Sequence, residues 1–164
     1  FNSIASCNRD TNKKSKAIVP PWPKQYRLPG SDSNSIAVWS LDGTRVAYTV
    51  HRPETFIAII DQRHGIIHRI RNNSDRTFSN LKFSPNGRFL FSANHGGIVN
   101  LWDNVTGNYE QLQQWNIRED IVDEFGETYL YSFDISPCSK YIVMAAYTSS
   151  RVVLKSVENG ETVR

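Results

Sequence analysis

Short apolar runs separated by turn residues follow one another along the chain from residue 34 onward. Most of the runs hold four to eight residues rich in Val, Ile, Phe, Tyr and Trp, and they show almost no sustained 3.6-residue period. Such runs, bounded by Gly, Pro, Asn, Asp and Ser, are typical of strands. We therefore predict an all-β chain with strands at 36–39, 44–50, 55–61, 65–70, 80–83, 88–93, 97–103, 109–115, 129–135, 140–147, 151–157 and 161–164.

Two landmarks recur along these strands and indicate an internal repeat. Each unit carries a Ser in the turn after its first strand and a Gly in the turn after its third strand. The landmarks are Ser40, Ser84 and Ser136 for the serines and Gly65, Gly107 and Gly160 for the glycines. The serines lie 44 and 52 residues apart and the glycines 42 and 53. Four-stranded units of about 40 to 50 residues have the period of propeller blades, because such a sheet covers both faces only by stacking on the next copy.

The repeat divides the chain into blades at about 34–78, 79–127 and 128–164. We therefore predict a partial β-propeller of about three four-stranded antiparallel blades. Closed propellers typically have about four to eight blades. The segment is accordingly expected to be part of a longer propeller, completed by the same or another chain.

Residues 1–33 differ from the rest and are predicted to form an extended N-terminal arm. Four prolines fall in residues 17–33, and residues 1–30 hold six basic residues against one acid. Proline fixes φ and lacks an amide donor, so it disfavours helices and interior strands. The net charge of +3 therefore comes from the arm.

The middle copy, LKFSPNGRFLFSANHGGIVNLWDNVTG at 81–107, resembles a unit of the WD-repeat family of β-propellers. Both run from a strand through a Ser-Pro turn and a hairpin to a strand that ends in Trp-Asp. The resemblance covers residues 34–164, although only the middle copy is strongly marked. It implies a WD-repeat-like propeller that acts as a scaffold for protein–protein interactions and not as an enzyme.

In that family a His, a Ser or Thr, a Trp and a hairpin Asp form a hydrogen-bonded network within the blade. Carried over by position, Ser92 is the strand hydroxyl and Trp102 the indole donor, with Asp103 ending the strand. Asp75 remains from the turn upstream of the blade, while Gly96 stands where the hairpin acid is expected. The resemblance therefore implies a structural role for four residues of an incomplete network, namely Ser92, Trp102, Asp103 and Asp75.

The outer copies depart further from the pattern. Ile60 and Lys155 stand at the Trp position of the first and third copies. The first copy, WSLDGTRVAY at 39–48, is also similar to Tol-type and peptidase-associated propellers. An alternative is therefore the propeller portion of a peptidase-like or other enzyme whose catalytic domain lies outside this segment.

Motifs that carry chemistry are missing from the sequence. We find no Gly-x-Ser-x-Gly elbow, no phosphate-binding Gly-rich loop and no His-Glu-x-x-His motif. His64 and His68 are four residues apart, but they lie at a turn leading into a strand and lack a third ligand. His51 and His95 fall in predicted hairpins and are expected to be exposed. We predict no catalytic residue, no metal site and no cofactor.

Two charged segments are candidate partner-binding surfaces. One is the arm, and the other is the acidic insertion NIREDIVDEFGE at 116–127, in which Ile121, Val122 and Phe125 are predicted to form one helical turn. The candidate residues are Trp22, Lys24 and Arg27 in the arm and Glu119, Asp120, Asp123 and Glu124 in the insertion. The simpler interpretation of the insertion is a solvated loop, and the functional alternative is an acidic loop that binds a basic partner or the arm itself.

Other proteins, including further propeller blades, are the expected partners. Nucleic acid contacted through the basic arm is a second alternative. No apolar run reaches the length of about 18 residues that a membrane helix needs, and the N-terminus lacks the apolar core of a secretion signal. We therefore expect no membrane contact and an intracellular setting, cytoplasmic or nuclear.

Overall fold

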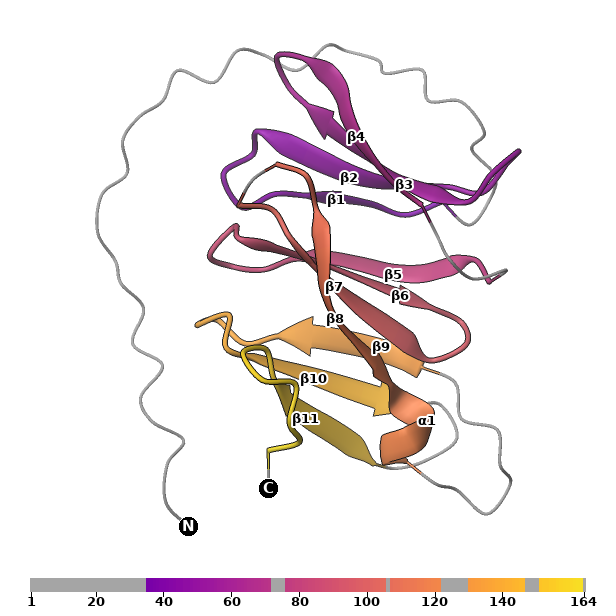
Figure 1. Ribbon diagram of the computed structural model, residues 1–164, viewed down its shortest axis with the longest axis vertical. Helices are drawn as coiled ribbons and strands as arrows, with labels where there is room; N and C mark the ends of the chain where they lie inside the picture. Colours follow the sequence, from indigo (N-terminus) through magenta and orange to yellow (C-terminus); the bar gives the residue numbers. More distant parts are fainter. Residues whose placement is uncertain (1–34, 72–75, 106, 122–129, 147–150, 164) are drawn as a thin grey trace.

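The computed structural model describes residues 35–71, 76–105, 107–121, 130–146 and 151–163. Its elements are β1 (Ala37–Trp39), β2 (Arg45–Val50), β3 (Phe56–Asp61), β4 (Gly65–Arg71), β5 (Phe78–Phe83), β6 (Phe89–Asn94), β7 (Ile98–Asp103), β8 (Glu110–Asn116), α1 (Ile117–Asp120), β9 (Leu130–Ile135), β10 (Tyr141–Ala146) and β11 (Val152–Ser156). The strands form three antiparallel sheets, β1 to β4, β5 to β8 and β9 to β11, in which neighbours follow the chain order. Figure 1 shows these sheets stacked one on another along the long axis of the molecule. The predicted all-β, partial-propeller architecture is confirmed.

The fourth strand of the third blade is the one predicted strand that does not form. In its place a single bridge joins Lys155 to Thr162. Two backbone hydrogen bonds flank this bridge, from Ser156 to the Glu161 carbonyl at 2.9 Å and from Val163 to the Leu154 carbonyl at 2.7 Å. The pairing consists of one bridge and does not extend into a strand. The third sheet therefore has three strands where four were predicted.

Several residues singled out in the sequence fall outside the described part of the chain. They are the arm over 1–33 with Trp22, Lys24 and Arg27, the upstream turn residue Asp75, and the insertion acids Asp123 and Glu124. Their assigned roles remain predictions.

The landmark serines explain why the first turn of each unit repeats. Each Ser Oγ accepts a hydrogen bond from the amide five residues later, at 2.9 Å for Ser40 and Ser84 and 3.0 Å for Ser136. In the second blade Gly87 closes this turn with φ of +72°, where a residue without a Cβ carries no steric penalty. The third blade places Ser139 in the same region, with φ of +61°. The Ser side chain therefore fixes the turn even where Gly is replaced.

Two apolar cores lie between neighbouring sheets and hold the stack together. The first joins Ile57 and Ile59 of the first sheet to Leu90 and Trp102 of the second. The second core contains Phe91, on the opposite face of the second sheet, together with residues of the third sheet, including Ile142 and Met144. Every residue of β6 is buried because both of its faces are covered. This explains why Phe89, Leu90 and Phe91 are apolar in succession and do not alternate with polar residues.

One of the predicted hairpin histidines is not exposed. His51 is 8% exposed, and among the described residues neither of its ring nitrogens has a hydrogen-bond partner, whereas His95 is exposed as expected. The bends of the first hairpin fall at 52–54, after His51. His51 therefore lies at the end of the strand and not at the hairpin tip, which corrects the prediction.

Candidate functional site

The second blade contains a buried hydrogen bond between two neighbouring strands. Trp102 on β7 donates from Nε1 to the Ser92 Oγ on β6 over 2.9 Å. Ser92 is fully buried and Trp102 is 7% exposed. Trp102 pairs across the sheet with Leu90, so this face packs against the first blade. The indole therefore fills the first core while its polar nitrogen is satisfied within the sheet.

The hairpin of the second blade uses a different polar residue from the one the family pattern expects. Asn94 Oδ1 accepts hydrogen bonds from the amides of Gly96 at 2.9 Å and Ile98 at 3.1 Å. A Cβ at Gly96 would lie 2.7 Å from Cδ of Arg76 and 3.1 Å from Asn94 Oδ1. The Arg76 side chain therefore lies over Gly96 and would have to shift for a larger residue there. The signal that sequence reasoning missed is the Asn two residues before the glycine.

A charged pair occupies the Trp position in the third blade. Lys155 is 8% exposed, and its Nζ donates to Asp120 Oδ1 over 2.8 Å and to Thr162 Oγ1 over 3.2 Å. Thr162 Oγ1 also donates to Asp120 Oδ1 over 3.3 Å. This closed triangle satisfies a nearly buried ammonium group, which would otherwise be costly. Asp120, a predicted partner-binding residue, thus already has partners within the chain.

The first part of the acidic insertion is fixed to the blades and is not a solvated loop. A helical turn forms as α1, for which Asn116 supplies the N-cap and accepts from the Arg118 amide over 3.2 Å. Of the turn predicted at Ile121, Val122 and Phe125, Val122 and Phe125 lie outside the described residues. Ile117 and Ile121 are buried in the second core. Glu119 is exposed, with its Oε1 accepting from Asn116 Nδ2 over 3.2 Å. α1 therefore positions Asp120 toward the third blade.

The third strands of the first two blades end in aspartates that cap the following turn. Asp103 Oδ1 accepts from the Val105 amide at 2.9 Å, and its Oδ2 lies 3.0 Å from Arg88 Nη2. The hydrogen bond from Arg88 holds the pKa of Asp103 below its ordinary value, against a smaller opposing effect of burial. Burial raises the pKa of Asp61, but hydrogen bonds from Arg63 and His64 outweigh it, so this pKa is also lowered. Both carboxylates are therefore ionised at neutral pH.

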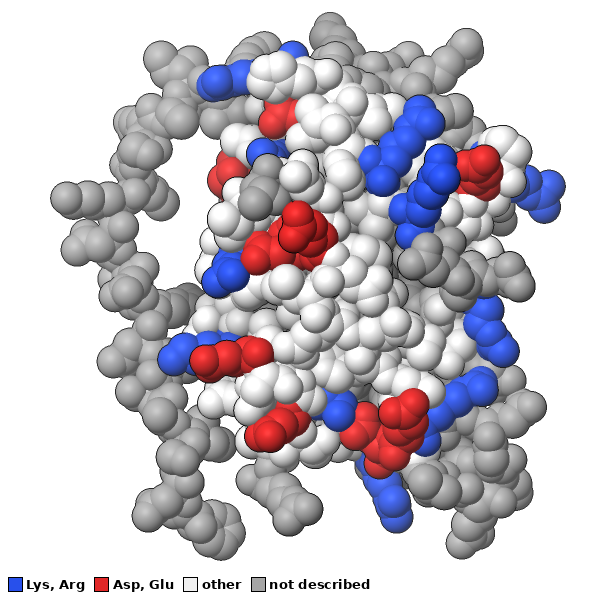
Figure 2. All heavy atoms as spheres, in the orientation of Figure 1, with Lys and Arg blue, Asp and Glu red and all other residues white. Residues whose placement is uncertain are grey.

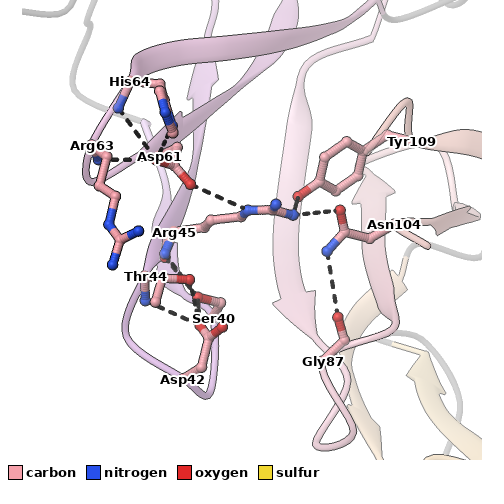
Figure 3. A network of polar contacts seen from close by, with 10 residues as sticks. All are labelled: Ser40, Asp42, Thr44, Arg45, Asp61, Arg63, His64, Gly87, Asn104 and Tyr109. Carbon is pink, nitrogen blue, oxygen red and sulfur yellow. Dashed lines mark hydrogen bonds and ion pairs between the residues drawn. The ribbon is translucent and has the colours of Figure 1, made fainter. Parts of the chain in front are cut away.

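A polar network joins the first and second blades at these turns (Figure 3). Arg45 lies 3.6 Å from Asp61 within its own blade, while its Nη1 donates to Asn104 Oδ1 at 2.7 Å and reaches the Tyr109 hydroxyl at 3.5 Å. Asn104 Nδ2 in turn donates to the Gly87 carbonyl at 3.4 Å. Tyr109 is 3% exposed, and burial raises its pKa. Arg45 therefore connects turns of two blades by side-chain contacts.

His64 and His68, the two histidines considered as metal ligands, contact different residues. His64 Nδ1 lies 2.8 Å from Asp61 Oδ1, whereas the His68 ring lies 5.6 Å from the ring of Tyr109. In the part of the chain that the structure describes, no group of three or more His, Cys, Asp or Glu side chains could hold a metal ion. Within the polar network the Ser40 and Thr44 hydroxyls donate to Asp42 Oδ1 at 2.6 and 2.9 Å, and these contacts close the first turn of the blade.

The outward face of the third sheet is the feature best suited to bind a partner. Ala145 pairs with Val152, and Val143 with Leu154, so these four side chains share a face. The opposite face, with Ile142 and Met144, belongs to the second core. Val152 is 67% exposed and Val143 36%, and the others are partly exposed. The equivalent face of the second sheet, with Phe89 and Phe91, is covered by the third sheet. Ser132 and Asp134 of β9 lie opposite Ala145 and Val143 on the same face. The candidate functional site is therefore this sheet face with its four apolar side chains, which we call the outward face.

Comparison with known proteins shows what this arrangement resembles. No family model matches the chain. The chain is 33% identical over 58 residues to polyadenylation factor subunit 2 of Candida albicans, a match that spans 35% of this chain and 11% of that protein. The β-propeller domain of Cps50 (Swd1) from Myceliophteria thermophila matches with a TM-score of 0.61 and 16% identity, covering 78% of this chain and 41% of that chain. A candidate 6-phosphogluconolactonase from Bacteroides uniformis matches with a TM-score of 0.58 and 21% identity, covering 77% and 38%.

These likenesses show the fold alone, since both structural matches have low sequence identity. The WD-repeat-like propeller predicted from the sequence is confirmed as a fold. The chain spans less than half of either matched structure. None of the described helices is both long and apolar enough to cross a membrane.

Proposed function

We propose that this chain is a propeller segment that serves as a non-catalytic scaffold for protein–protein interactions within a larger chain or assembly. The outward face of the third sheet is the observation that carries this proposal. The equivalent face of the second sheet, which carries Phe91, is buried against the third sheet. On the outward face, by contrast, Val152 is 67% exposed. A further blade, from the same or another chain, is the partner that fits this face.

The energetics favour covering this face. Full burial of one Val or Leu side chain contributes roughly 1.5 to 3 kcal/mol, and several such side chains line the outward face. A partner that presents a face like that of Leu90 and Trp102 would place apolar side chains opposite them. Exposed apolar sheet faces of this kind mark interaction sites.

The Candida albicans relative is named as a subunit of a polyadenylation factor, and that name supports a multiprotein setting for this chain. An intracellular location, cytoplasmic or nuclear, is part of the same proposal. The structural match to a candidate lactonase does not favour an enzyme, because one fold carries many functions. The proposal therefore depends on the outward face and not on a relative's activity.

Association in solution tests the proposal. The isolated chain should self-associate as its concentration rises in analytical ultracentrifugation, because its outward face lacks a cover. Val143→Asp with Val152→Asp should suppress this association, since charges would then lie on the apolar face. Val105→Asp is the matched control, because Val105 is 70% exposed in a turn of the second blade. A stable monomer at every concentration, with V143D/V152D behaving as the unmodified chain, would contradict the proposal.

A further inference from the structure

The outer edge of the first sheet carries an unusual cluster of basic side chains. β4 is the last strand of that sheet, so no described strand lies beyond it. Arg69 and Arg71 on β4 and Arg63 in the preceding turn are all exposed, and β4 contains no acid. Asp61, at the end of β3, is held by Arg45, by His64 and by backbone amides. The edge therefore presents positive charge that no acid of β4 neutralises.

The register places two of these arginines side by side on one face of the sheet. Arg69 pairs with Ala58 and Arg71 with Phe56, and the Arg69 guanidinium lies 5.2 Å from the centre of the Phe56 ring. Residues two apart on a strand are separated by about 7 Å. Figure 2 shows several basic side chains at the upper right of the molecule, with an acidic group beside them, over the part of the first sheet where Figure 1 places β3 and β4.

Two exposed apolar side chains precede the arginines on the same strand. Ile66 is 37% exposed and Ile67 is 38% exposed. Charged side chains on an edge strand commonly prevent unwanted strand pairing, but an edge built only for that purpose gains nothing from exposed isoleucines. The combination of apolar and basic positions with a backbone edge that no described strand covers fits a ligand that is itself an extended chain.

The outer edge of the second sheet shows that this pattern belongs to β4 and not to outer strands in general. β8 contains no Lys or Arg and begins with Glu110. Its Gln113 donates from Nε2 to the carbonyls of Val157 and Glu158, each at 3.1 Å, and so contacts the third blade. β8 therefore carries an acid and contacts the third blade, whereas β4 carries only basic charges.

We propose that the β4 edge binds an extended acidic peptide that adds to the first sheet as a further strand. Main-chain hydrogen bonds to the open edge would supply affinity, and acidic residues alternating with apolar ones would match the arginines and isoleucines. Sequence-tolerant binding of single-stranded nucleic acid normally uses exposed aromatic rings, which β4 lacks, and the His68 ring lies against Tyr109. The inference rests on the proposed scaffold function and names a second surface and its partner.

Fluorescence anisotropy with labelled peptides tests this inference on the full 164-residue chain. The probe is an acetylated ten-residue peptide of alternating Val and Glu. We expect saturable binding that Arg69→Glu with Arg71→Glu weakens by about tenfold or more, because two attractive contacts become repulsive. Lys140→Glu is the matched control, since Lys140 is exposed in the third blade, and it should leave the affinity unchanged. Circular dichroism verifies that each variant remains folded.

Two further probes separate strand addition from simple charge attraction. The same peptide with alternate backbone amides methylated keeps its charges but cannot pair along one edge, so its binding should be lost. Equal binding of the methylated peptide, equal binding to R69E/R71E, or binding of a ten-residue oligouridylate in place of the peptide would each overturn the inference. If the peptide does not bind but the chain still associates with rising concentration, only this inference is refuted. V143D/V152D tests the outward face separately.

Discussion

The second and third blades follow the same plan but differ in what occupies two equivalent positions. In the second blade Trp102 and Phe91 lie on opposite faces of one sheet, and both are buried. In the third blade Lys155 replaces the indole and pairs with Asp120, while Val143 stands at the position of Phe91 and is 36% exposed. The second blade is therefore complete on both faces, whereas the third is tied to the second by a charged contact and remains open outward.

This difference shows how a degenerate repeat keeps its fold. Lys155 brings a nearly buried ammonium group to the Trp position of the third blade, and an element from outside the repeat, α1, supplies Asp120 to pair with it. The outward position needs no large side chain until a partner covers it. Whether a sheet is covered on one face or on both thus determines which positions of a degenerate repeat keep large apolar residues.

The strongest test of the comparison substitutes equivalent positions on the two sheets. Phe91→Ala should lower the free energy of unfolding by about 3 to 5 kcal/mol, because it opens a cavity in the second core. Val143→Ala should lower it by less than about 1 kcal/mol, since the side chain is partly exposed. Urea denaturation measures both changes. Similar losses at the two positions would mean that the third sheet is covered in the isolated chain.

Trp102 tests the other face of the second blade. Trp102→Ala should cost about 3 to 5 kcal/mol of stability, for lost packing against the first blade and for the unpaired Ser92 hydroxyl. Trp102→Phe keeps most of the ring and should cost less, about 1 to 3 kcal/mol, mainly for the missing indole donor. Thermal and urea unfolding distinguish these values. An unchanged melting temperature for Trp102→Ala would show that the middle repeat is misassigned.

Lys155 and Asp120 test whether the charged pair replaces the indole. Lys155→Ala should destabilise the chain by about 3 kcal/mol, because it leaves a mostly buried carboxylate without its ammonium partner. Combining Asp120→Asn with Lys155→Met should recover part of that loss, since neither charge then remains. A double variant as unstable as the sum of its single substitutions would contradict the assigned pair.

The turn aspartates predict a smaller difference that depends on pH. The lowered pKa of Asp103 means that its ionised form is favoured in the folded state. Its stabilising contribution is present above the unfolded pKa, and it is lost as pH falls through the lower folded pKa, below about pH 4. Asp103→Asn should remove this part of the acid dependence, worth under about 1 kcal/mol. The third blade has Ser156 at this position, so Ser156→Ala is the control that should leave the pH profile unchanged.

Most of the strands could be predicted from the sequence because each carries its own signal of apolar runs between turn residues. The last predicted strand did not form, since ETVR carries a β-like composition but only Thr162 makes a bridge. His51 was assigned to an exposed hairpin because local pattern does not show where a hairpin bends. The contacts of Arg45 with Asn104 and of Lys155 with Asp120 were also missed, since each joins residues far apart in the chain.

The sequence by itself determined the repeat, the turns and the class of fold, because Ser40, Ser84 and Ser136 act on amides only five residues away. Tertiary structure decided which apolar faces are covered and which polar residues find partners. Phe91 and Val143 occupy the same place in their repeats, and only the stacking of sheets makes one buried and the other partly exposed. Burial depends on neighbours distant in sequence, so the outward face and the β4 edge become visible only once the blades are assembled.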